Sequence, residues 1–206
     1  MNKIIISGEI DKNFTASHKS SGERFLETTI KSKRDSGFVD EIPIVFSEVF
    51  LKQMNNATNN RVEIVGEVRN FNYNRHSYLF VFVKEVRTYD GKDKNFVEIN
   101  GFVYKRPVYR EKAKSNRKIV QFLIVNNRTY AKSDYIPCIA WGRNALRVKD
   151  YRVGNQLKAQ GRFQSRTFIK KYDDGTKEKK MAYELSLEKI ERRMDKIEVE
   201  IGENYS

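Results

Sequence analysis

Residues 134–143 combine three features that could do chemistry: aromatic rings, a strand-like alternation and a terminal cation. Because successive side chains of a β-strand point to opposite faces, Tyr135, Ile139 and the only tryptophan, Trp141, share one side. Aromatic rings beside positive charge form surfaces on which nucleic-acid bases stack. The competing interpretation places Trp141 in the core, since large aromatic side chains are mostly buried.

Two further predicted strands pair an aromatic residue with nearby cations. Arg162, Arg166 and Phe168 share one face of a strand, and Arg128 and Tyr130 lie on one side at the end of another. Three strands that each offer a ring and a positive charge fit single-stranded nucleic acid, whose bases stack while its phosphates contact Arg and Lys. A core of buried aromatics with solvated cations explains this pattern poorly, so the pattern favours binding.

The charge of the chain favours a polyanionic partner. Its 206 residues carry a formal net charge of +13, with a pI near 9.7. Residues 1–90 hold 13 Lys and Arg against 12 Asp and Glu, whereas residues 91–206 hold 27 against 15. This asymmetry predicts one binding half and one scaffold half, with nucleic acid as the first candidate partner and an anionic membrane as the second. The membrane alternative is weaker, because the sequence has neither a basic amphipathic helix nor an apolar run of about 20 residues.

Motifs for other chemistries are missing. Neither His18 nor His76 stands in a Ser or Cys arrangement that resembles a triad, and neither a P-loop nor a His-Glu-x-x-His motif occurs. Asp173 and Asp174 stand in an Asp-Gly turn, which favours a turn over a metal pair. The single Cys138 excludes an internal disulfide and a thiolate zinc cluster, and the N-terminus does not resemble a signal peptide. We therefore expect a non-enzymatic cytoplasmic protein, associated with the nucleoid, that needs no cofactor or metal.

The chain repeats itself at a nearly constant spacing. Three short stretches recur in order, at offsets of 93, 94 and 95 residues. The pairs are Asn2 to Gly8 with Asn95 to Gly101, Glu41 to Val45 with Tyr135 to Ile139, and Val62 to Gly66 with Leu157 to Gly161. A fourth match, at an offset of 105, indicates a longer final hairpin in the second copy. We infer two copies of one domain, with a boundary near residues 89–93.

Each copy shows the same order of predicted elements: three strands, a helical segment, and two strands that form a hairpin. The first strand is predicted to end at Gly8 or Gly101, and residues 110–118 of the second copy are predicted to form a basic loop. A five-stranded OB barrel has this order, with its helix between the third and fourth strands. The predicted fold is therefore all-β, with two tandem Greek-key OB barrels. Residues 1–90 form a degenerate OB domain for structure and assembly, residues 94–195 form the binding domain, and residues 196–206 form a C-terminal tail.

Four stretches of the second copy match the strand pattern of a known family. They are Asn95 to Gly101, Phe122 to Tyr130, Asp134 to Ala145, and Gln160 to Phe168. Together they resemble the bacterial single-stranded DNA-binding proteins (SSB), over about residues 95–192. The first copy resembles this family only faintly.

The resemblance implies an OB fold, no catalysis, and sequence-independent binding of single-stranded DNA in replication, recombination or repair. It also implies base stacking at four aromatic positions, which here are Tyr130, Tyr135, Trp141 and Phe168. The cations expected to contact phosphate are Lys105, Arg106, Arg110, Lys118, Arg128, Arg143, Arg162, Arg166, Lys170 and Lys171.

The first copy departs from the family pattern at two of the stacking positions. Glu41 stands at the position of Tyr135, and Ser47 stands at that of Trp141. A carboxylate repels phosphate, so we expect the first copy to be a structural partner or a protein-docking module. The family mostly gathers four OB folds in one particle, so the resemblance implies a homodimer of this two-domain chain. Replication or recombination proteins are the expected protein partners.

Two alternatives to DNA binding stay open at the level of sequence. One is an RNA-binding or primosome-type OB module, because stacking alone does not distinguish DNA from RNA. The other is an OB-based protein-interaction scaffold, which the nearly neutral first half favours.

Overall fold

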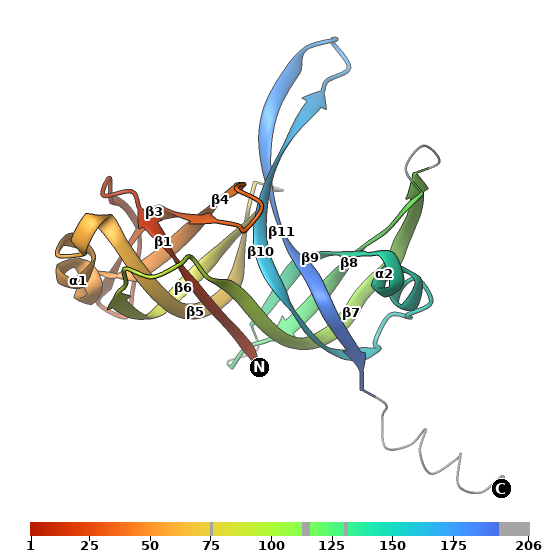
Figure 1. Ribbon diagram of the computed structural model, residues 1–206, viewed down its shortest axis with the longest axis horizontal. Helices are drawn as coiled ribbons and strands as arrows, with labels where there is room; N and C mark the ends of the chain where they lie inside the picture. The colour runs from red at the N-terminus through yellow and green to blue at the C-terminus, as the bar shows by residue number, and fades with distance from the viewer. Residues whose placement is uncertain (75, 113–115, 130–131, 194–206) are drawn as a thin grey trace, which may run out of the picture. The chain divides into compact units, whose positions relative to one another are not determined.

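The computed structural model describes residues 1–74, 76–112, 116–129 and 132–193. Over these residues the chain is built mostly of β-strands (Figure 1). It divides into two compact units. The first unit holds residues 3–97 and 162–185, and the second holds residues 1–2, 98–161 and the described residues from 186 onward. No helix in the described part of the chain is long and apolar enough to cross a membrane.

The first unit contains a closed five-stranded barrel. Its strands are β1 (Asn2–Ile10), β3 (Glu23–Lys33), β4 (Val39–Ser47), β5 (Arg61–Tyr73) and β6 (His76–Thr88). They are hydrogen-bonded in the order β1–β3–β4–β6–β5, and β5 pairs back to β1. The short strand β2 (Thr15–Ser20) pairs with β3, and the segments η1 (Glu48–Phe50), α1 (Leu51–Asn55) and η2 (Thr58–Asn60) lie between β4 and β5. Alternate strand residues such as Ile4, Ile6 and Ile64 are fully buried and fill the barrel.

The second barrel repeats this arrangement. Its strands are β7 (Asn95–Lys112), β8 (Arg117–Asn127), β9 (Ser133–Trp141), β10 (Gln156–Lys171) and β11 (Lys177–Arg192). They follow the order β7–β8–β9–β11–β10, and β10 pairs back to β7. Helix α2 (Gly142–Val148) connects β9 to β10. Ile99, Ile124 and Leu157 are fully buried. Strands β10 and β11 contribute to both units, because their distal residues, 162–185, belong to the first.

Both strand orders are those of an OB barrel, with the helix between the third and fourth strands. The predicted all-β class and OB architecture are therefore confirmed.

The pairing register reproduces the sequence repeat residue by residue. Phe25 pairs with Ser47 in the first barrel, and Ile119 pairs with Trp141 in the second. Both members of the second pair stand 94 residues after those of the first. A buried ion pair also recurs at this spacing: Arg34 contacts Asp40 and Arg128 contacts Asp134, and both carboxylates have no exposed side-chain surface. This repeated Arg–Asp pair was not predicted from the sequence.

The repeated glycines have a different role from the one predicted. β1 continues past Gly8 to Ile10, and β7 continues past Gly101 to Lys112, so neither strand ends at its glycine. A Cβ atom at Gly8 would lie 2.0 Å from the Lys31 carbonyl oxygen, and one at Gly101 would lie 2.6 Å from that of Val125. Glycine is therefore required where the neighbouring strand crosses closely. The predicted basic loop of residues 110–118 is also wrong at both ends, since β7 and β8 extend into it.

Candidate nucleic-acid interface

The outward face of strands β7, β8 and β9 in the second unit carries a row of exposed side chains that includes Trp141. Burial alternates along β8, so that Ile119, Gln121, Leu123 and Val125 face outward while their neighbours are buried. Trp141 pairs across the sheet with Ile119, which pairs in turn with Arg110 on β7. Trp141 is 41% exposed, so it is not a core tryptophan. A ring, an aliphatic side chain and a guanidinium thus lie side by side.

A second row begins at Tyr135, which lies six residues before Trp141 on β9. Tyr135 is half-buried and pairs with Val125, which pairs with Phe102. The Tyr104 ring meets the Tyr135 ring edge-to-face, with 4.7 Å between centroids. Phe102 and Tyr104 are 37% and 43% exposed. Three aromatic rings therefore gather at this end of the face.

Phe102 and Tyr104 were missed by the sequence analysis because it ended the first strand at Gly101. Tyr104 faces outward because it alternates with Phe102 across the buried Val103, and the register shift between Val103 and Lys105 then places Lys105 opposite the outward-facing Leu123. Such a bulge re-aims a side chain without ending the strand. The alternation of Phe102 and Tyr104 just after the glycine was the available signal.

Cations border the middle of this face. Lys105 and Arg106 are exposed, and Lys105 pairs with Leu123, which pairs with Pro137 of β9. The distance along β9 from Tyr135 to Trp141 is about 20 Å at the usual strand rise. We call this surface, from Phe102 and Tyr135 to Trp141, the aromatic face. It offers rings at both ends, an apolar centre, and positive charge along β7.

The cations predicted to contact phosphate differ in their exposure to solvent and in whether they already pair with a carboxylate. Arg110 and Arg143 are exposed, as are Lys170 and Lys171, and Lys118 is half-buried. The Arg128 side chain, by contrast, lies 2.9 Å from the buried Asp134 carboxylate.

Two further predicted cations have partners on the hairpin. Arg166 Nε donates to Glu184 Oε1 at 3.1 Å, and Arg162 donates to Gln164 Oε1 at 3.5 Å. The charges of Arg128 and Arg166 are thus partly committed to carboxylates within the chain.

Phe168 lies on β10 within residues 162–185, which belong to the first unit. It is 36% exposed, and the Arg166 guanidinium lies 5.7 Å from its ring centroid. Farther along, Lys170 stands 4.7 Å from the ring centroid of Tyr172. The structure therefore brings Tyr135 and Trp141 onto one strand of the second unit and places Phe168 on a segment of the other unit. Tyr130 lies outside the described residues.

Hydrogen bonds at the tip of this hairpin shift the pKa values of two exposed carboxyl groups. Bonds from Tyr172 and Lys180 lower the pKa of Glu178, and bonds from the hydroxyl and amide of Thr176 lower that of Asp174. Both groups are therefore ionised at neutral pH, beside the lysines of the tip.

In the first unit, the positions equivalent to Tyr135 and Trp141 form no open platform. Ser47 is buried and hydrogen-bonded to the Glu23 carboxylate. Phe25, opposite Ser47, is covered by the His18 ring, which stacks on it at 4.7 Å. Glu41 is exposed.

A different aromatic set lies on the β5–β6 hairpin of the first unit, and the sequence analysis did not identify it. Phe71, Tyr73 and Tyr78 are 56%, 58% and 52% exposed. The rings of Phe71 and Tyr73 are nearly parallel, with 6.3 Å between centroids. Arg69, on the same face, lies 3.7 Å from the Phe82 ring centroid. The alternation Phe71-Asn72-Tyr73 was the signal that could have identified this set.

Among the described residues, no group of three or more His, Cys, Asp or Glu side chains is placed to hold a metal ion. Rings and cations are therefore the groups that this interface offers.

Comparison with known proteins is consistent with this geometry. The model of the Single-strand binding protein family matches residues 94–193. The wild-type single-stranded DNA binding protein from Thermus aquaticus is similar over 95% of this chain and 94% of that chain, at 14% identity and a TM-score of 0.71. A deletion variant of that protein gives the same identity and TM-score, over 95% of both chains.

The N-terminal domain of PriB from Thermoanaerobacter tencongensis matches 44% of this chain and 98% of its own, at 29% identity and a TM-score of 0.38. No curated protein matches the chain. The Thermus structures show that the likeness in fold extends over nearly the whole chain. Over residues 94–193, the second OB barrel thus matches the single-strand binding protein family.

Proposed function

We propose that this protein binds single-stranded DNA without reading its sequence, by stacking bases on exposed rings and pairing phosphates with nearby cations. The observation that carries the proposal is the aromatic face, where Trp141 and Tyr135 lie outward beside Arg110 and Lys105. Bases of every kind have an aromatic surface, so stacking favours binding without sequence preference. The family assignment of residues 94–193 supports the same ligand.

The stacking residues are Tyr135 and Trp141, with Phe102 and Tyr104 extending the aromatic face, and with Phe168 and Tyr130 as further proposed positions. Each stacked base contributes roughly 1–3 kcal/mol, so three or four rings are enough for useful affinity. Lys105, Arg106 and Arg110 are the strongest candidates for phosphate contacts, because they are exposed along β7. We place this activity in DNA replication, recombination or repair, with proteins of those processes as partners.

Fluorescence of the only tryptophan tests this proposal directly. A base that stacks on Trp141 quenches its emission, so titration with oligo-dT is expected to give saturable quenching. A duplex of equal length is the control, because its bases are already stacked and paired. Unchanged emission at saturating oligo-dT, with binding confirmed by anisotropy, would rule out stacking at Trp141.

RNA is the alternative ligand, because base stacking does not read the 2′-hydroxyl. Competition between oligo-dT and oligo-U of equal length distinguishes the two. We expect oligo-dT to compete better, and a preference for oligo-U would assign the protein to RNA.

We further propose that two copies of the chain associate, so that four OB barrels act together. Light scattering at micromolar concentration is expected to give twice the mass of 24.3 kDa. A monomeric mass that persists in the presence of DNA would contradict this assembly.

A further inference from the structure

The distal part of the β10–β11 hairpin is held by polar groups of the first unit. The Asn95 side chain bonds the backbone of Phe163 twice, donating to its carbonyl at 2.7 Å and accepting from its amide at 2.9 Å. This amide side chain therefore mimics a neighbouring strand. It satisfies both backbone groups of a residue whose own side chain is fully buried.

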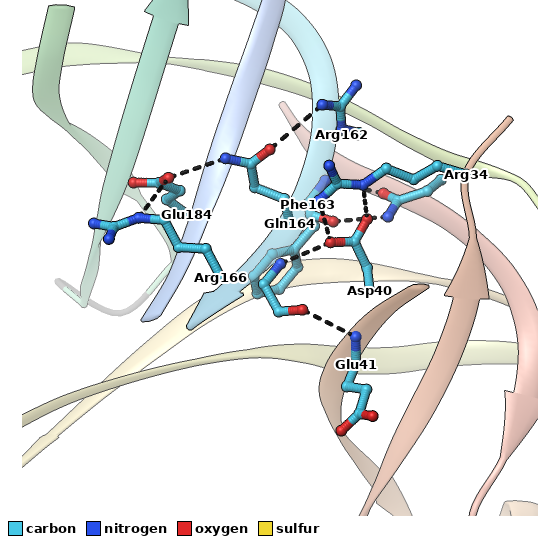
Figure 2. Close-up of polar contacts among 10 residues, drawn as sticks. Arg34, Asp40, Glu41, Arg162, Phe163, Gln164, Arg166 and Glu184 are labelled. Atoms are coloured by element: carbon cyan, nitrogen blue, oxygen red, sulfur yellow. Dashed lines mark hydrogen bonds and ion pairs between the residues drawn. The ribbon is translucent and has the colours of Figure 1, made fainter. Parts of the chain in front are cut away.

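A buried carboxylate makes the second contact, two residues farther along β10. Asp40 Oδ1 accepts the Ser165 amide at 2.9 Å, and the Glu41 amide donates to Ser165 Oγ at 3.1 Å (Figure 2). The Asp40 side chain has no exposed surface, and Arg34 holds both of its oxygens, at 2.6 and 2.5 Å. All three hydrogen bonds to Asp40 come from N–H groups, and the two carboxyl oxygens accept them.

These contacts lie close in the chain to proposed DNA-binding side chains. Next to Ser165 comes Arg166, whose guanidinium donates to the buried Glu184 and approaches the ring of Phe168. Gln164 donates to the same Glu184 oxygen at 2.9 Å. Figure 2 shows Arg34 and Asp40 on one side of β10, with Arg166 and Glu184 on the other. The segment before Phe168 is therefore fixed on both sides.

We propose that Arg34, Asp40 and Asn95 form a clamp that positions the hairpin for DNA, so that the first unit sets the affinity of a binding element encoded in the second copy. This inference rests on the proposed function, since it assigns Phe168 to the bound strand. The clamp residues do not touch DNA in this scheme; they are positioning residues that act through β10.

The physical reason is the cost of ordering a long ribbon. A two-stranded hairpin is marginally stable by itself, and a mobile side chain must lose conformational freedom when it binds. Because the clamp fixes Phe163 and Ser165, Phe168 is already ordered before a base arrives. Loss of the clamp therefore weakens binding even though no DNA contact is removed.

The variant Asp40→Asn tests the clamp, with Asp35→Asn as its matched control. Both changes remove one negative charge, but Asp40 is buried in β4, whereas Asp35 lies in the turn before β4, is exposed and pairs with Lys92. The asparagine NH2 group would face either Arg34 or the Ser165 amide, and both are donors. Asn95→Ala is the second variant, because it removes the Phe163 bonds without changing charge.

Hydrogen exchange of the free protein is the first measurement. We expect the amides of Phe163 and Ser165 to exchange at least about tenfold faster in Asp40→Asn or Asn95→Ala, and to be unchanged in Asp35→Asn. This readout needs no DNA, so it judges the clamp independently of the proposed function. If Asp40→Asn does not fold, the exchange of these amides in Asn95→Ala tests the clamp instead. Unchanged exchange in the folded variant overturns the clamp.

DNA affinity is the second measurement. Removing a negative charge by itself favours DNA, so Asp35→Asn is expected to bind equally or more tightly. Asp40→Asn is expected to bind about three- to tenfold more weakly, and Asn95→Ala similarly, because the hairpin is no longer ordered. Equal affinity of Asp40→Asn and Asp35→Asn overturns the role in binding.

A double-mutant cycle with Phe168→Ala shows whether the clamp acts through this ring. Phe168→Ala is expected to cost less affinity in the Asp40→Asn background than in the native chain. Additive losses would overturn the coupling. If Phe168→Ala has no effect in the native chain, stacking at Phe168 fails as part of the proposed function, and the exchange and affinity comparisons still judge the clamp.

Discussion

Phe168 is the residue at which a binding role and a structural role can be separated most clearly. Its ring is 36% exposed and lies beside the Arg166 guanidinium, so removing it creates no cavity in a barrel. Trp141 has the same partly exposed character on β9. Stability and DNA affinity should therefore respond differently to substitution at these positions.

Phe168→Ala is expected to weaken binding of oligo-dT by roughly 1–3 kcal/mol, because one stacked base loses its partner. Trp141 fluorescence measures the affinity, and thermal unfolding is expected to be nearly unchanged. Ile169→Ala is the control, since Ile169 is the adjacent residue and is 64% exposed on the opposite face of β10. A large loss of stability in Phe168→Ala would show that the ring is structural.

The basic residues fall into two groups: substitution in one group is expected to lower stability, and substitution in the other is expected to change the salt dependence of DNA binding. Arg128→Ala is expected to destabilise the second unit by roughly 3–5 kcal/mol, because it leaves the buried Asp134 carboxylate without its ion pair. Lys105→Ala is expected to leave stability unchanged and to reduce the dependence of log K on log salt by about 0.7, the value of one phosphate contact on a single strand. Chemical denaturation and titrations at several salt concentrations measure the two effects. An unchanged slope of log K against log salt in Lys105→Ala would mean that Lys105 does not contact phosphate.

At the scale of elements, the β5–β6 hairpin gives the first unit exposed aromatic rings of its own. The β5–β6 hairpin presents Phe71, Tyr73 and Tyr78 to solvent, although this unit lacks rings at Glu41 and Ser47. Exposed aromatic clusters of this kind mark interaction surfaces. The first unit therefore has an exposed aromatic surface of its own. It lies on β5 and β6, whereas the positions equivalent to Tyr135 and Trp141 lie on β4.

We expect the double variant Phe71→Ala, Tyr73→Ala to bind oligo-dT more weakly by roughly 1–3 kcal/mol, because two parallel rings that can stack with bases are lost. Anisotropy titration measures the effect. Val49→Ala, which removes an exposed apolar residue elsewhere in the same unit, is the control. Unaltered affinity in the double variant would assign this hairpin to a protein partner.

Strands and faces that follow from local sequence patterns could be predicted from the sequence. Features that depend on how two strands cross in the fold could not. Alternation identified Tyr135 and Trp141 as one face, and the repeat identified two barrels with equivalent registers. The continuation of β7 through Gly101 depends on the close approach of Val125, which no local pattern reveals. Phe102 and Tyr104 were missed for that reason.

Contacts between distant residues were beyond the sequence for the same reason. The sequence pattern assigned no role to Asp40. In the structure, Asp40 is buried and accepts a hydrogen bond from the amide of Ser165, 125 residues later. The pairing of Arg128, a predicted phosphate contact, with the buried Asp134 likewise could not be predicted from the sequence. Burial and partners, which decide these roles, depend on the tertiary structure.

At the scale of the whole molecule, the net charge is not the same as the number of cations that are free to contact phosphate. The excess of positive charge belongs to residues 91–206, but Arg128 and Arg166 already face buried or nearly buried carboxylates. Long-range attraction still depends on the sum of charges, whereas phosphate contact depends on the cations that remain exposed. Association should thus be faster than the number of phosphate contacts alone would indicate, and more so at low salt.

The clamp on β10 has a consequence for solubility. Asn95 and Asp40 occupy the backbone donors of Phe163 and Ser165, which would otherwise form an unpaired strand edge. Open edges of this kind are templates on which other chains add strands and aggregate. A fragment that begins after Asp40, such as residues 94–193 alone, would expose the Ser165 amide beside the apolar Phe163. Within the first unit, Asp40 and Asn95 thus shield this edge of β10 from self-association.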